Sequence, residues 1–148
     1  MKNILIIHPS VERQDVLEKS LNTDTTIFSN EYNVIHSIRK NIQHIGFIYH
    51  NNVSSHFPFF NNKTSGHQTS FFSKEFHDFL SILVQISSKP IIDLITCNID
   101  DTDIIQEIHQ LMNLYKIPIR YSLDQTGNSF VGGDWIMESH MVNIREIY

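Results

Sequence analysis

Short apolar runs alternate with amphipathic segments along most of this chain, and this alternation constrains the fold more than any other feature. Runs at 4–7, 45–49 and 91–96 have the length and composition of buried strands. Between such runs, apolar residues recur with the 3.6-residue period of a helix with one buried face. Because consecutive parallel strands need a crossover between them, this order predicts an α/β fold. We expect a mostly parallel sheet with helices on both faces, a three-layer αβα sandwich.

The expected elements follow one another without an internal repeat or a linker, which predicts a single domain over residues 1–148. Strands are expected at 4–7, 25–28, 45–49, 91–96 and 117–121. Helices are expected at 11–21, 32–42, 73–89 and 100–115. Turn residues then flank two short segments, 134–138 and 141–147, which we expect to form a C-terminal β-hairpin.

The segment 50–72 interrupts this regular order. It is rich in turn-forming residues, and loops of this length inside a compact domain are uncommon and often functional. Three of its aromatic residues, Phe57, Phe59 and Phe60, lie close together in the sequence. They could form an exposed contact patch or anchor the loop on the domain, and anchoring is the commoner case.

Composition and charge narrow the range of partners and compartments. The net charge is -5, and no Lys/Arg cluster is present, so nucleic acid is not expected as a partner. No apolar run approaches the roughly 20 residues that span a bilayer, and the first run is too short for a signal peptide. The single cysteine cannot form an intramolecular disulfide. We therefore expect a soluble, intracellular and cytoplasmic protein, with a virion location left open.

Two chemically reactive residues follow predicted strands. His50 comes directly after the run 45–49, and Cys97 comes directly after the run 91–96. In parallel sheets, ligands bind at the carboxyl ends of the strands. A cysteine nucleophile needs a nearby base, which is usually histidine. The separation of 97 − 50 = 47 residues is close to the roughly 50 residues between histidine and cysteine in caspases, although the caspase signature around the cysteine is absent.

Other interpretations of these residues stay open at the level of sequence. A lone cysteine at the end of a strand is commonly a packing residue. A helix that begins soon after Cys97 would lower the pKa of its thiol, whereas Asp100 and Asp101 would raise it. Lys116 and Arg120 could meet an acidic substrate side chain, but we expect ordinary solvated charges.

The sequence does not predict a metal or a cofactor. Of the nine histidines, His50, His56 and His67 share one loop, but their spacing matches no zinc motif. No glycine-rich phosphate loop follows the first predicted strand, which disfavours a flavodoxin-like domain that binds small molecules.

Three segments carry a resemblance to a known family. They are DLITCN at 93–98, LDQTGN at 123–128 and GGDWIME at 132–138. Together they resemble a bacterial domain family of unknown function, found near the N-termini of very large repeat-bearing surface proteins, which looks related to the caspase-like cysteine peptidases. The family pattern has a strand ending in Gly-Cys-Asn, then Asp-x-Thr-Gly, then Gly-Gly-Asp-Trp-x-Leu-Glu. The upstream strands and first helix are similar too, so the resemblance spans nearly the whole chain.

This resemblance implies a caspase-like fold and a catalytic site in which each residue has a specific role. Cys97 would be the nucleophile and His50 the base, and backbone amides near Asn51 and Cys97 would form the oxyanion hole. The implied partner is a peptide or protein. Asp134 is a candidate for substrate contact, although an aspartate in a turn more often accepts hydrogen bonds from backbone amides.

This chain departs from the family pattern beside both reactive residues. The family's Ser-His-Gly is here Tyr49-His50-Asn51, and the glycine before the cysteine is Thr96. Both changes crowd the expected site. They keep open a second hypothesis, a catalytically silent caspase-like module with a structural or binding role, for example in a viral particle or a host-interaction protein. Homo-oligomers are also left open.

Overall fold

The computed structural model describes residues 3–9, 25–28, 34, 42–49, 56–60, 70–96, 99, 101–122, 136–137 and 142–143. Five strands form the main sheet: β1 (Asn3–Ile7), β2 (Thr25–Phe28), β3 (His44–Ile48), β4 (Ile91–Ile95) and β5 (Ile119–Tyr121). Two helices, α3 (Lys74–Ile86) and α4 (Thr102–Tyr115), connect β3 to β4 and β4 to β5. A separate two-stranded sheet contains β6 (Ile136–Met137) and β7 (Val142–Asn143).

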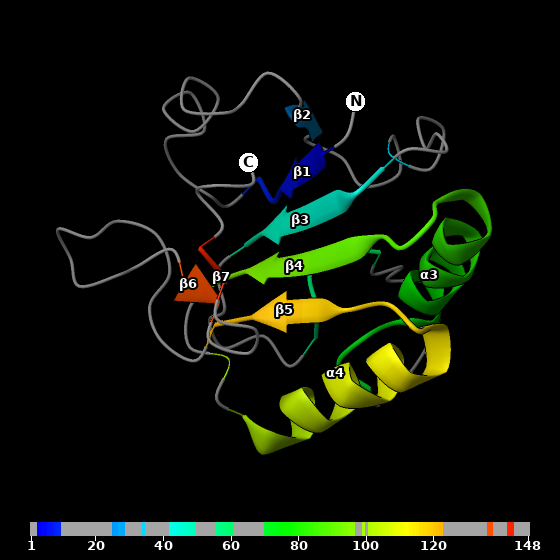
Figure 1. The fold of residues 1–148 in the computed structure, drawn as a ribbon. Helices are drawn as coiled ribbons and strands as arrows, with labels where there is room; N and C mark the ends of the chain where they lie inside the picture. The colour runs from blue at the N-terminus through cyan, green and yellow to red at the C-terminus, as the bar shows by residue number, and fades with distance from the viewer. Residues whose placement is uncertain are drawn as a thin grey trace, which may run out of the picture.

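The main sheet has the strand order β2-β1-β3-β4-β5, and every neighbouring pair in it is parallel. Figure 1 shows the arrowheads of these strands pointing to one side of the molecule, with β6 and β7 lying toward that side. The predicted α/β class and parallel sheet are therefore confirmed. Among the described helices, none is long and apolar enough to cross a membrane.

The predicted strands agree closely with the observed ones. The largest difference is in β5, which begins at Ile119 rather than at residue 117. Pro118 precedes it, and proline has no backbone N–H to donate to a sheet ladder. Its carbonyl still accepts a hydrogen bond from the amide of Ile92 at 2.9 Å, so the chain already runs beside β4 at this point.

Alternation along each strand gives the sheet two chemically different faces. One face is apolar and buried, and its members are Ile4, Ile6, Ile45, Phe47, Ile92, Leu94, Ile119 and Tyr121. The opposite face carries polar side chains in the middle of the sheet, which are described with the site below. The apolar face forms the hydrophobic core, because it is the face on which α3 and α4 pack.

Phe47 is at the centre of this core. Its ring lies 5.1–6.3 Å from five phenylalanine rings, Phe57, Phe59, Phe60, Phe76 and Phe79. The first three belong to the predicted loop and the last two to α3, so one side chain of β3 holds both segments on the sheet. The loop phenylalanines are buried, which confirms the expectation that they anchor the loop rather than form an exposed patch.

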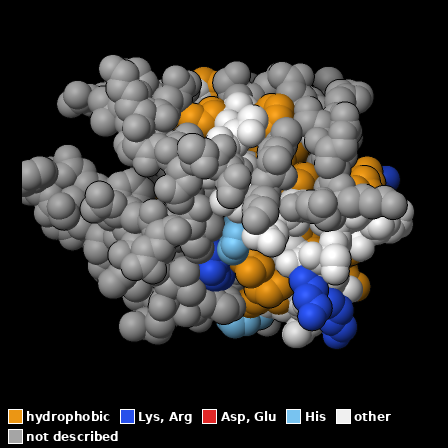
Figure 2. Space-filling model, turned by 45° about the horizontal axis from the view of Figure 1, so that its top comes forward, with side chains coloured by type: hydrophobic (Ala, Val, Ile, Leu, Met, Phe, Trp, Pro, Cys, Tyr) orange, Lys and Arg blue, Asp and Glu red, His pale blue; other side chains and the backbone are white. Residues whose placement is uncertain are grey.

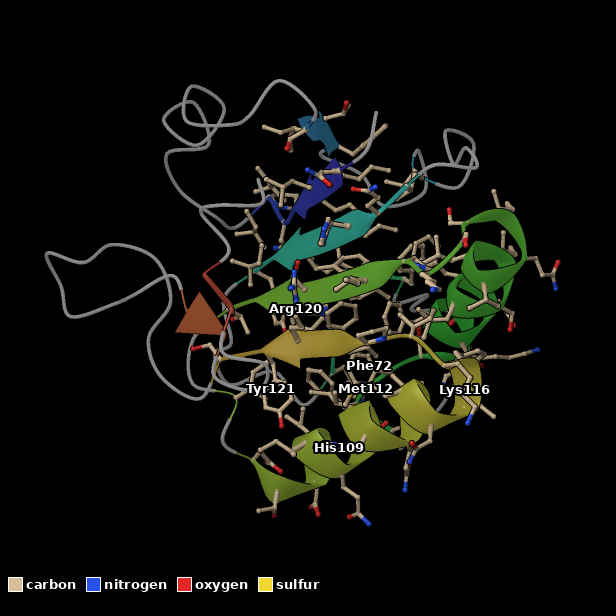
Figure 3. The ribbon with its side chains drawn as sticks, viewed as in Figure 1. Phe72, His109, Met112, Lys116, Arg120 and Tyr121 are labelled. Carbon is tan, nitrogen blue, oxygen red and sulfur yellow. The ribbon has the colours of Figure 1, made fainter. Side chains whose placement is uncertain are left out.

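The described ends of this loop are also held by hydrogen bonds. The amide of Phe57 donates to the carbonyl of Phe71 at 2.8 Å, and this bond brings the two ends of the loop together. The carboxylate of Glu107 on α4 accepts from the amides of Phe71 and Phe72, at 2.8 and 3.4 Å. Figure 3 shows Phe72, Met112 and Tyr121 between β5 and α4. The loop is therefore tied to both the sheet and a helix.

Both helices begin at side-chain caps. Ser73 caps α3, and its hydroxyl accepts from the amide of Phe76 at 3.1 Å. Asp101 caps α4, and its carboxylate accepts from the amides of Asp103 and Ile104 at 2.8 and 3.3 Å. One expectation for α3 is wrong: Val84, which the helical period put on the buried face, is 39% exposed. The buried stripe of α3 contains Phe76, Phe79, Leu80 and Leu83 and continues to the partly buried Ile86, so Val84 lies beside this stripe.

Some predicted elements lie outside the described residues. Both described helices pack on the same face of the sheet, so the second helical layer of the predicted sandwich stays a prediction. The segment 11–21 lies outside the described residues, and of 32–42 only Val34, which is helical and buried, and Ile42 are described. Strands β6 and β7 pair antiparallel, but the residues that would connect them as a hairpin are not described.

The described surface shows isolated rather than continuous apolar exposure. Its exposed large hydrophobic residues are Ile82, Val84 and Leu114, on α3 and α4. Figure 2 shows hydrophobic side chains at several separate places on one face, with histidine and basic side chains in the lower part of that view. Isolated exposures of this kind are normal for globular proteins and do not indicate a docking surface.

The free-energy cost of the left-handed backbone conformation at the end of α4 can be tested by substitution. Lys116 caps this helix in the left-handed conformation, with φ 59°, a region that costs free energy for residues with a Cβ. We expect Lys116→Gly to raise the free energy of unfolding by roughly 0.5–1 kcal/mol in urea denaturation. Asn113→Gly, at an exposed position inside the same helix, is the control and should lower it, by roughly 0.3 kcal/mol. Destabilisation by both variants would contradict this account of the cap.

Candidate functional site

The carboxyl ends of β1, β3 and β4 lie at one edge of the sheet. Ile7 pairs with Ile48, and Ile48 pairs with Ile95, so the three strands end level with one another. Two backbone hydrogen bonds continue the pairing by one residue. The amide of His8 donates to Ile48 O at 2.9 Å, and the amide of Tyr49 donates to Ile95 O at 3.3 Å. This edge is where a parallel sheet offers its ligand site.

The four site residues that the sequence predicts, His50, Asn51, Cys97 and Asp134, lie outside the described residues. The structure describes the residues directly before the two reactive ones, Tyr49 and Thr96. It also describes β6, which begins two residues after Asp134. The structure therefore describes the strand ends, whereas the contacts of the four predicted site residues stay predictions.

Tyr49 and Thr96 are both buried at this edge, with exposed fractions of 4% and 3%. The Tyr49 ring packs edge-on against Phe57 and Phe59, with centroid distances of 5.3 and 6.0 Å. Within the described part of the chain, neither the Tyr49 hydroxyl nor the Thr96 hydroxyl has a hydrogen-bond partner. Burial raises the pKa of the Tyr49 hydroxyl, so this group stays neutral.

His8 is a residue of this edge that the sequence analysis did not single out. It follows β1, and its ring contacts Phe59 edge-on at 5.7 Å, so it shares a neighbour with Tyr49. The strand order reverses between β1 and β3, because β1 leads to one side of the sheet and β3 to the other. Such a reversal is the usual position of a ligand crevice. The sequence does indicate His8 as a residue of this edge, because it directly follows the first apolar run.

A buried ion pair occupies the opposite face of the sheet. Asp93 on β4 is fully buried, and Arg120, its register partner on β5, is 6% exposed. The guanidinium donates from Nε to Asp93 Oδ1 and from Nη2 to Asp93 Oδ2, the second at 2.8 Å. The expectation that Arg120 is a solvated charge is therefore wrong. The signal was a charge inside each of two apolar strand sequences, since such charges are almost always paired when buried.

His44 on β3 extends this pair across a third strand. Its Nδ1 lies 3.4 Å from Arg120 Nη2, and because arginine can only donate, the imidazole nitrogen accepts. Figure 3 shows Arg120 lying across the sheet from β5 toward β3. Burial, and to a smaller extent the charge of Arg120, lowers the pKa of His44, against the opposing effect of Asp93. Neutral His44 thus completes a polar cluster that spans β3, β4 and β5.

Two other described groups near the edge have structural partners. Asp101, which the sequence places close to Cys97, caps α4, so its charge is bound to backbone amides. The amide of Ile99 donates to Ser122 O at 3.0 Å and fixes the chain between β4 and α4. Within the described residues, no group of three His, Cys, Asp or Glu side chains could hold a metal ion.

Comparison of the chain with protein-family models, with curated proteins and with solved structures gives no match. Any assignment of function therefore rests on the residues and geometry of this chain.

The ion pair between Asp93 and Arg120 can be tested by a double-mutant cycle. Arg120→Met leaves a buried, uncompensated carboxylate, and we expect the free energy of unfolding to fall by about 3–5 kcal/mol. Combining it with Asp93→Val removes both charges and should recover most of this loss, because the folded protein then contains no unpaired buried charge. Additive effects of the two substitutions in urea denaturation would contradict the pairing.

The lowered pKa of His44 predicts a pH dependence of stability. The unfolded chain takes up the proton near the ordinary histidine pKa of about 6.5, before the folded protein does. The stability due to neutral His44 is therefore complete above that pH and is lost as the pH falls from it through the lower folded pKa. Compared with His44→Gln, which cannot be protonated, the wild type should lose more stability between pH 7 and pH 5. Parallel stability curves for the two proteins would contradict this.

Proposed function

We propose that this chain is a caspase-like domain that acts as a cysteine hydrolase on peptide bonds. In this proposal Cys97 is the nucleophile and His50 is the general base. Backbone amides near Asn51 and Cys97 would form the oxyanion hole. Asp134 is a candidate for substrate contact. The proposal follows from the resemblance of the sequence and is supported by one observation on the sheet.

That observation is the register of β3 and β4. Ile48 pairs with Ile95, an offset of 95 − 48 = 47 residues, and the separation of His50 and Cys97 is also 97 − 50 = 47 residues. Continued by two positions, this register would set His50 and Cys97 beside each other at the carboxyl edge. A cysteine nucleophile needs a base within hydrogen-bond reach, and placement on neighbouring strand ends is compatible with that requirement.

The proposed chemistry uses this arrangement in two stages. His50 takes the proton of the Cys97 thiol, and the thiolate attacks the carbonyl carbon of the peptide bond. Backbone amides near Asn51 and Cys97 donate to the oxyanion that forms. When the C–N bond breaks, His50 returns the proton to the departing amine and a thioester remains on Cys97. Water, deprotonated by His50, then hydrolyses the thioester and releases the acid.

A second candidate function is a catalytically silent caspase-like module with a binding or structural role. It is favoured by the burial of Tyr49 and Thr96, which stand where the family pattern has a serine and a glycine. Larger side chains at both positions leave less room for a substrate beside the two reactive residues. The two functions differ in whether the Cys97 thiol is activated by His50.

Labelling of Cys97 by a peptidyl electrophile at neutral pH tests the hydrolase. We expect the wild-type protein to be labelled much faster than His50→Ala, on the order of a hundredfold, because general-base assistance contributes at least that much. Intact-protein mass spectrometry follows the rate, and Cys97→Ala shows whether the label is on this residue. His56→Ala, which alters a histidine of the described loop, is a matched control that should keep the wild-type rate.

Equal labelling rates in wild-type protein and His50→Ala, or no labelling of Cys97, would reject the hydrolase in favour of the silent module. Cleavage of a peptide library that is lost in Cys97→Ala would reject the silent module instead.

A further inference from the structure

We propose that the hydroxyl groups of Tyr49 and Thr96 form a subsite for a neutral, hydrogen-bonding side chain of a peptide, and that a carboxamide is the group it accepts. The inference rests on the proposed function, since these residues directly precede His50 and Cys97. It concerns two of the positions where this chain departs from the family pattern.

The first step of the argument is the position of the two side chains. The amide of Tyr49 donates to Ile95 O at 3.3 Å, which sets residue 49 beside the end of β4, where Thr96 follows. By alternation, Tyr49 lies on the same sheet face as Phe47, and Thr96 lies on the same face as Leu94. The two hydroxyl-bearing residues therefore occupy neighbouring positions on one face, at the edge that binds ligands in parallel sheets.

The second step is that both hydroxyls lack a partner. Each belongs to a side chain that is more than nine-tenths buried, and neither is hydrogen-bonded within the part of the chain that the structure describes. Folded proteins leave few buried polar groups unsatisfied, and each exception requires an explanation. A ligand group that supplies the missing hydrogen bonds is such an explanation at an edge where a substrate is proposed to bind.

The third step is the kind of group that would fit. The Tyr49 ring is packed against the phenyl rings of Phe57 and Phe59, and burial is what raises the pKa of its hydroxyl. A carboxylate would lose its hydration in these surroundings. A hydroxyl can both donate and accept, and a carboxamide offers an N–H₂ and a carbonyl oxygen to match the pair. An alkyl group would leave both hydroxyls unsatisfied.

Binding of three small probes tests the subsite. They are the N-acetyl, N-methylamide derivatives of asparagine, aspartate and leucine, titrated into the full chain and followed by NMR. We expect the asparagine probe to bind about tenfold more tightly than the other two, as two net hydrogen bonds allow. The double variant Tyr49→Phe, Thr96→Val should lose this advantage. Equal affinities for the three probes, no saturable binding, or unchanged preference in the double variant would overturn the proposal.

Stability provides a second measurement, because both substitutions keep the shape of the side chain. If the hydroxyls have no partner in the free protein, the urea midpoint of each single variant should stay the same or rise. A lower midpoint in both variants would mean that the hydroxyls form bonds inside the folded protein, which overturns the subsite.

The Cys97→Ala variant separates this inference from the proposed function. It should bind the asparagine probe as tightly as the wild type does, because the subsite does not include the thiol. If Cys97 is not labelled by the electrophile but Cys97→Ala shows the preference for asparagine, the subsite stands and the hydrolase fails. If labelling depends on His50 but the three probes bind alike, the hydrolase stands and the subsite fails.

Discussion

The packing of aromatic rings around Phe47 is the interaction on which the rest of this structure depends. Phe47 lies on a central strand, and it contacts rings from the loop before α3 and from α3 itself. Large aromatic side chains contribute most of the apolar area that a small core can bury. Because the loop supplies three of these rings, a segment rich in turn formers is nevertheless a part of the core. This packing also fixes the position of the end of β3, which directly follows Phe47.

The two faces of the sheet carry different kinds of contact. The face with Phe47 carries the hydrophobic contacts, whereas the opposite face holds Asp93, Arg120 and His44 in a chain of contacts across three strands. Buried charges of this kind contribute little net stability but strongly disfavour arrangements that leave them unpaired. We infer that the cluster keeps β3, β4 and β5 in register. That register is the observation on which the proposed pairing of His50 with Cys97 rests.

Much of the fold could be predicted from local pattern, and the site could be predicted only in outline. The strands and the two described helices were predicted because periodicity is a local property. The same rules misplaced Val84, since a helical period does not show how wide the buried stripe of a helix is. They also treated Arg120 as solvated, because its partner Asp93 is 27 residues away in sequence. His8 was missed for the same reason: its significance comes from the strand order.

The sequence by itself determined that this is an α/β chain with a parallel sheet, and that His50 and Cys97 follow two separate strand-forming runs. These conclusions depend on residue type and short-range spacing. Only the tertiary structure decided that β3 and β4 are neighbours with an offset of 47 residues, and that Asp93 and Arg120 pair across β4 and β5. It also decided that Tyr49 and Thr96 are buried at one edge. The physical reason is that strand order and register arise from long-range packing, for which no short segment carries a signal.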